Sequence, residues 1–166
     1  MKMRFGVRVV TVVLAGMSAL PALAAAEVFM TIKGTTQGAF KGEASPAGHP
    51  EEIRLESVTQ GSALDGGKFK HRVLVITKAI GVASPQLEQA AANKEDLAEV
   101  TIRFAEGNGK GKMPTAVERV ELKHAAILSR RVVGQREVIR LTYQQILVTH
   151  VNGGTSTTDD WLVPMD

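Results

Sequence analysis

The sequence of 166 residues contains no cysteine. This absence excludes a disulfide scaffold, an iron–sulfur cluster, a thiolate zinc site and a cysteine nucleophile. The chain also lacks an excess of one charge, once residues 1–26 are set aside. That segment holds three of the 20 Lys and Arg residues and none of the 17 Asp and Glu residues, so the rest is neutral. A neutral chain disfavours a nucleic-acid binder, because phosphate binding requires a local excess of basic residues.

No apolar run in the sequence is long enough to span a membrane. The run at residues 9–20 has about 12 residues, whereas a transmembrane helix needs about 20. A basic segment precedes it and small residues follow it, which is the order found in a secretory signal peptide. We therefore expect residues 1–26 to be a signal peptide that is cleaved after Ala24 or Ala26. The mature protein is then expected to be periplasmic or secreted, with no membrane segment.

The remaining pattern predicts one β-rich domain over residues 27–151. Apolar and polar residues alternate at 51–60 and 98–105, as in half-buried strands. Segments rich in glycine or proline, at 34–50 and 61–70, predict loops, and the polar residues 152–166 predict a flexible C-terminal tail. Further strands are expected at 28–32, 71–80, 117–132 and 137–151. Six short strands without a βαβ rhythm indicate an antiparallel barrel or sandwich.

One helix is predicted at about residues 84–93. Pro85 suits the first helical position, and the Ser84 side chain is expected to cap the free backbone N–H groups.

A search for catalytic or metal-binding patterns finds little. The four histidines lie far apart in the sequence, and Ser129 has no evident base, so neither a metal site nor a nucleophile is expected. The Gly- and Lys-rich segment 107–112 fails the spacing of a phosphate-binding loop. Four arginines could form a basic patch, but a solvated hairpin end is the preferred explanation: Arg130, Arg131, Arg136 and Arg140. Asp159 and Asp160 could bind a cation, but an acidic tail is the preferred explanation. We expect no enzyme activity and no cofactor.

The order of four stretches resembles the Hcp family, the tube proteins of the type VI secretion system. The third stretch is the most specific, because the family has a strand, a helix start with Ser-Pro and a Thr-[Ile/Val]-Arg strand in that order. The stretches are VFMTIKG at 28–34, EEIRL at 51–55, ITKAI with ASPQL and VTIR at 76–80, 83–87 and 100–103, and VELKHAAILS with EVIRLTYQQI at 120–129 and 137–146. The resemblance implies a six-stranded β-barrel with one flanking helix, which assembles into rings, typically hexameric, that stack into a tube. It also implies spike proteins and small effector proteins as partners, and no catalytic residues.

Two hypotheses follow for the function. The first is a non-enzymatic, ring-forming structural subunit that is exported through its signal peptide. The alternative is a monomeric periplasmic barrel that binds a small ligand or a partner protein. A ring requires two different surface patches that fit each other, and the glycine-rich loops are the candidates. The predicted interface residues are Phe40, Lys41, Leu64, Lys68 and Phe69.

Overall fold

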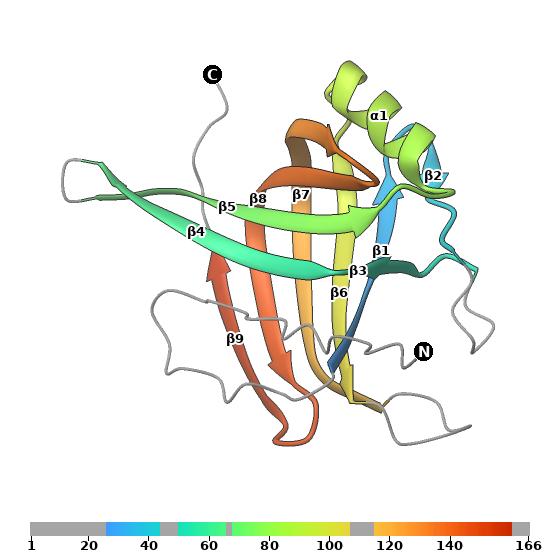
Figure 1. Ribbon diagram of the computed structural model, residues 1–166. Coiled ribbons are helices and arrows are strands. Elements are labelled where there is room, and N and C mark those ends of the chain that lie inside the picture. The colour runs from blue at the N-terminus through green and yellow to red at the C-terminus, as the bar shows by residue number, and fades with distance from the viewer. Residues whose placement is uncertain (1–25, 44–49, 66–67, 107–114, 161–166) are drawn as a thin grey trace, which may run out of the picture.

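The computed structural model describes residues 26–43, 50–65, 68–106 and 115–160. It is mainly β, with antiparallel strand pairing and one α-helix, as the sequence predicts (Figure 1). The elements are β1 (Ala26–Gly34), β2 (Gly38–Ala39), β3 (Ile53–Leu55), β4 (Ser57–Asp65), β5 (Lys68–Ala79), α1 (Ser84–Asn93), β6 (Leu97–Glu106), β7 (Thr115–Val133), β8 (Arg136–His150) and β9 (Thr155–Asp160). The expected strand at 51–60 is split into β3 and β4, and β2 and β9 are additional.

The strands close into a barrel because β3 and β4 form one nearly continuous segment. The sheet runs β1–β6–β7–β8–β5–β4, while β3 pairs with the other side of β1. Only Glu56 separates β3 from β4, and its backbone N–H donates a hydrogen bond to the Thr77 carbonyl of β5 at 2.8 Å. The segment 53–65 therefore joins β1 to β5 and closes the barrel. Counted as one strand, it completes six positions around the barrel with β1, β6, β7, β8 and β5.

Alternate side chains of the strands fill the barrel. On β6, Val100, Ile102 and Phe104 are buried, whereas Thr101 and Arg103 face outward, as the alternation predicts. Burying one such side chain contributes about 1.5–3 kcal/mol, so the barrel interior is the main source of stability. The largest apolar side chains that are completely buried in this core are Phe40, Met30, Ile53, Ile76, Leu87, Leu97, Ile102, Leu122, Ile139 and Leu141.

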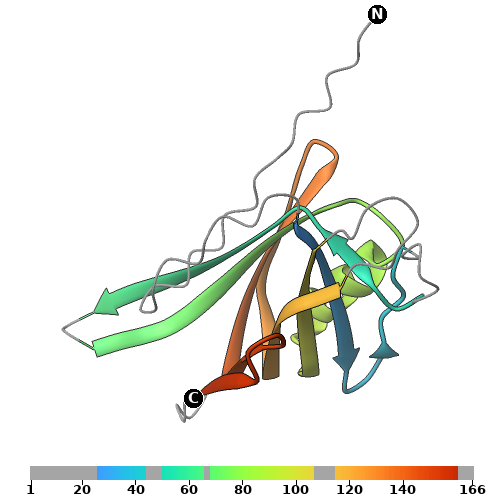
Figure 2. The same cartoon turned by 90° about the horizontal axis from the view of Figure 1, so that it is seen from below.

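Helix α1 closes one end of the barrel (Figure 2). Pro85 stands in its first turn, as predicted, but the N-cap residue is Ala83, and no side chain caps the N-terminus. The expectation that Ser84 caps the helix is wrong, because Ser84 is already helical and its hydroxyl accepts a hydrogen bond from the Gly81 N–H at 2.9 Å. At the other end, Lys94 adopts a left-handed conformation and its N–H bonds back to Ala91.

Three segments expected to be irregular contain strands, and the first, the predicted loop at 34–50, contains only the two-residue β2. The predicted loop at 61–70 is a hairpin, in which β4 and β5 continue through the pairs Ala63↔Lys70 and Leu64↔Phe69. Glycine and polar residues indicate a loop here, but the segments 61–65 and 68–70 are paired as strands. The predicted tail at 152–166 contains β9, which pairs antiparallel with β8 from residue 145 to 150. Strand β9 contains only Thr, Ser and Asp, so it has no apolar face from which alternation could predict a strand.

Candidate assembly surfaces and a buried ionic cluster

The outward face of β1, β6 and β7 balances its own charge. The Lys123 Nζ lies 3.4 Å from a Glu99 carboxylate oxygen on the neighbouring strand, and Arg119 lies 3.7 Å from Glu121. The Lys123–Glu99 pair joins two strands, and such a cross-strand pair of opposite charge stabilises a sheet by about 0.2–1 kcal/mol, whereas Arg119 and Glu121 both lie on β7. This face therefore satisfies much of its charge within one protomer.

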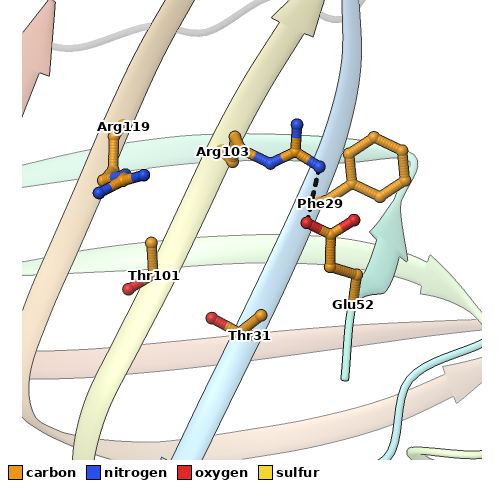
Figure 3. Close-up of a pocket in the computed structure, with 6 residues that line it drawn as sticks. All are labelled: Phe29, Thr31, Glu52, Thr101, Arg103 and Arg119. Carbon is orange, nitrogen blue, oxygen red and sulfur yellow. Dashed lines mark hydrogen bonds and ion pairs between the residues drawn. The ribbon is translucent and has the colours of Figure 1, made fainter. Parts of the chain in front are cut away.

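A hollow of about 380 Å³ lies on this face (Figure 3). Arg103 donates to the Glu52 carboxylate at 2.6 Å, and its guanidinium stacks over the Phe29 ring, 5.0 Å from the ring centre. Glu52 is nearly buried, and Arg103 thus fixes it against the barrel wall. Thr31, Thr101 and Arg119 complete the lining, so charged and hydroxyl side chains surround the apolar Phe29 ring.

A cluster of charged side chains is buried where the β5–α1 connection meets β8. The side chains of Lys78 and Glu137 are both completely buried, and the Lys78 Nζ lies 3.1 Å from a Glu137 oxygen. The Ser84 hydroxyl donates to the same oxygen at 2.7 Å, while Arg130 binds the second oxygen. Glu43 approaches Lys78 at 3.3 Å from the segment that follows β2. The cluster therefore fastens the start of α1 to β5, β7 and β8.

The surroundings of Glu137 lower its pKa. Burial acts in the opposite direction and raises the pKa, but hydrogen bonds from Ser84, Lys78 and Arg130, together with the Lys78 charge, outweigh it. Sequence alternation could have located this pair. Lys78 continues the inward series of Leu74 and Ile76, and Glu137 precedes the inward Ile139 by two residues.

A second buried carboxylate, Glu95, holds the turn between β1 and β2. Its Oε1 accepts from the backbone N–H groups of Thr36 and Gln37, both at 2.8 Å, and its Oε2 accepts from the Gln37 side chain. Burial raises the pKa of Glu95, but these hydrogen bonds lower it by more. Gly34 lies so close to this carboxylate that a Cβ atom there would overlap it.

Glu118 lies at the opposite end of the barrel. Its Oε2 is 3.3 Å from the His150 Nδ1, and its buried Oε1 has no protein partner among the described residues. Burial raises the pKa of Glu118, although the neighbouring His150 opposes the shift. His124 also pairs with an acid, Asp96 at 3.2 Å. Within the described ranges, no three acidic or histidine side chains are placed to hold a metal ion.

The predicted interface residues do not lie together. Phe40 is fully buried in the core of its own protomer, so its assignment to an interface is wrong. A lone aromatic residue in a glycine-rich segment packs inward here because β2 and the residues after it cover the barrel end. Lys41 is exposed, and its backbone N–H donates to the Gln86 side chain at 2.7 Å. Leu64, Lys68 and Phe69 lie on the β4–β5 hairpin, and their side chains lie outside the described residues.

The possible basic patch separates into paired and unpaired arginines. Arg130 binds Glu137, and Arg136 on β8 binds Glu56, the residue between β3 and β4. Arg131 and Arg140 are exposed. Residues 1–25, which include nearly all of the expected signal peptide, lie outside the described structure. No helix within the described ranges has the length and apolar character needed to cross a membrane.

Comparison with known proteins decides the family. A family model described as "Type VI secretion system effector, Hcp" matches residues 29–150, from β1 to the end of β8. The chain belongs to the Hcp family. The "Major exported protein" of Pseudomonas aeruginosa is 27% identical over 170 residues, covering 85% of this chain and 98% of that protein. Hcp proteins are secreted structural components of type VI secretion systems, which agrees with the β-rich fold found here.

Solved Hcp structures share this fold. The secreted protein Hcp3 from Pseudomonas aeruginosa superimposes with a TM-score of 0.70 at 27% identity, covering 81% of this chain and 99% of Hcp3. An Hcp1 protein from E. coli EAEC 042 gives a TM-score of 0.73 at 18% identity, covering 84% of this chain and all of that one. The second likeness supports the fold alone.

Proposed function

We propose that this protein is a ring-forming Hcp subunit that builds a type VI secretion tube or a tube-like assembly, typically from hexameric rings. The observation that carries the proposal is the family match over the whole barrel, from β1 to β8. The proposed role is structural and not enzymatic. Its proposed partners are further copies of itself, a spike protein and small effector proteins.

The β4–β5 hairpin supports self-assembly. The pairing of β5 with β8 begins at Leu74, so residues 68–73 of β5 pair with β4 alone. The hairpin consequently reaches away from the barrel (Figures 1 and 2). A projecting strand pair has unpaired backbone groups along its outer edges, and such an edge can pair with a strand of another chain. We propose that Leu64, Lys68 and Phe69 meet a different patch, which includes Lys41, on the neighbouring copy.

Export is the second part of the proposal. Residues 1–26 would direct the protein out of the cytoplasm and be removed after Ala24 or Ala26, leaving the mature protein in the periplasm or secreted. The intact mass of protein recovered from a periplasmic extract tests this directly. A mass that lacks 24 or 26 residues supports cleavage, whereas a full-length mass in the cytoplasmic fraction refutes export by this route.

Assembly is tested by light scattering and negative-stain electron microscopy of the purified protein. The expected result is a closed ring at micromolar protein, and its loss in Phe69→Asp. Val151→Asp is the matched control, because Val151 is an exposed apolar residue directly after β8 and lies outside the β4–β5 hairpin. A strict monomer across this concentration range would refute ring formation and leave the monomeric binding barrel as the better explanation.

A further inference from the structure

One outward face of the barrel carries two arginines that no described acid balances. We call it the arginine face. Strands β7 and β8 form its centre near their connecting turn, and β5 continues it. Its residues follow from the strand register, in which directly paired residues point to the same side: Ser129, Arg131 and Val133 on β7, Arg136, Val138 and Arg140 on β8, and Val75 and Thr77 on β5.

Arg131 and Arg140 are diagonal neighbours on this face. Arg131 pairs with Val138 and Arg140 pairs with Ser129, which places the two arginines about 7–8 Å apart by ordinary sheet geometry. Both are exposed, and neither forms an ion pair or a side-chain hydrogen bond with any residue of the described ranges. Like charges at such spacing repel each other, and a bound anion would remove the repulsion.

The other outward face provides the contrast. There two exposed cations lie within 4 Å of a glutamate, in the pairs Arg119–Glu121 and Lys123–Glu99. The third, Lys33, is directly opposite Glu99 in the strand register. On the arginine face, only Arg136 has such a partner, Glu56. Arg130 belongs to the core side of β7 and is committed to Glu137. The surplus positive charge is thus local and does not reflect the composition of the chain.

Exposed aliphatic side chains accompany the arginines. Val133 is 57% exposed on the same face, and Leu128, at the irregular position of β7, is 57% exposed. Arginine next to exposed apolar area is typical of protein interfaces, whereas nucleic-acid sites have more basic residues and phosphate-binding donors. We propose that the arginine face binds an acidic segment of another protein, with carboxylates on Arg131 and Arg140 and an apolar side chain against Val133. This proposal does not depend on ring formation.

The test measures binding of a defined probe by fluorescence anisotropy at low salt. The probe is a labelled peptide of about 12 residues that contains several Glu and Leu residues among Gly and Ser. Arg131→Gln/Arg140→Gln removes two charges from the arginine face, and Arg54→Gln/Arg119→Gln removes two exposed, acid-paired arginines elsewhere. We expect Kd to rise about 10-fold in the first variant and less than about 2-fold in the second. Circular dichroism shows whether each variant is folded, and the single change Arg131→Gln replaces the double one if it is not.

Four results would overturn the proposal. Equal weakening in both double variants would mean that net charge alone attracts the peptide. Equal affinity for a peptide with Gln in place of Glu would remove the role of carboxylates. Tighter binding of single-stranded DNA of the same charge would indicate a nucleic-acid partner. Loss of self-association in Arg131→Gln/Arg140→Gln, measured by light scattering without peptide, would show that a second copy covers the face. If the protein is a monomer but still binds the peptide through these arginines, ring formation is refuted and the peptide-binding proposal stands.

Discussion

Replacing Lys78 by methionine tests whether the buried ionic cluster holds α1 to the barrel. Methionine keeps most of the volume of the lysine stem and removes the ammonium group that lies 3.1 Å from Glu137 and 3.3 Å from Glu43. Lys78 and Glu137 have no exposed side-chain surface, so water cannot replace the lost partner. The substitution leaves a buried carboxylate with one cation fewer.

The expected cost is near the lower end of the range for a broken buried pair. Removing one partner of a buried salt bridge typically costs about 3–5 kcal/mol. Glu137 keeps the hydrogen bonds from Ser84 and Arg130, which continue to stabilise its charge. We therefore expect Lys78→Met to lower the free energy of unfolding by about 3 kcal/mol. Glu137→Gln in the same background should cost less than it does alone, because the carboxylate has already lost Lys78.

Urea unfolding of the single and double variants measures these free energies. Arg54→Gln is the control, because Arg54 forms an exposed ion pair with Glu27 at 2.8 Å and should cost at most about 0.5 kcal/mol. All samples are compared at a protein concentration where light scattering gives the same assembly state. A cost below about 1 kcal/mol for Lys78→Met, or strictly additive costs in the double variant, would refute the reasoning.

Three further predictions concern the core, a close approach and a titrating group. Phe40→Ala should cost about 3–5 kcal/mol in urea unfolding, whereas Lys41→Ala should cost almost nothing; similar small effects would contradict the burial of Phe40. Gly34→Ala should cost about 1–3 kcal/mol, because a Cβ atom would displace Glu95 from its backbone donors, while the exposed Gly153→Ala serves as a control. A raised pKa makes the folded Glu118 bind more protons than the unfolded one, so stability falls as pH rises above 4.5. Glu118→Gln should therefore stabilise the protein at about pH 8 but not at about pH 4, and a pH-independent effect would count against this.

The strands with an apolar period could be predicted from the sequence. In residues 98–105, alternation placed Val100, Ile102 and Phe104 inside the barrel, and they are buried. Helix α1 was predicted from Ser84 and Pro85, although Ser84 serves the buried cluster instead of capping the helix. Local spacing is sufficient for these elements because their own apolar faces determine them.

The missed strands depend on backbone pairing with a neighbouring strand and not on an apolar period of their own. Strand β9 has no apolar face and exists because β8 offers it an edge. Strand β4 extends to Asp65 and β5 begins at Lys68, within a segment whose glycines indicate a loop. Phe40 was placed at an interface because a single aromatic residue has no period, and only the folded barrel shows which way it points. The pairing of Arg130 and Arg136 with acids likewise depends on tertiary contacts.

The segment 53–65 is the seam of the barrel, because it pairs with β1 on one side and with β5 on the other. β3 is hydrogen-bonded to β1 and β4 to β5, with a single residue, Glu56, between them. An opening that releases this segment frees the edges of β1 and β5 at the same time. The amide protons of β1 and β5 that bond to this segment should therefore exchange with solvent in one concerted event and with one common opening free energy, although the two strands are far apart in the sequence. A protease that cut within the seam would release both sides of the barrel at once.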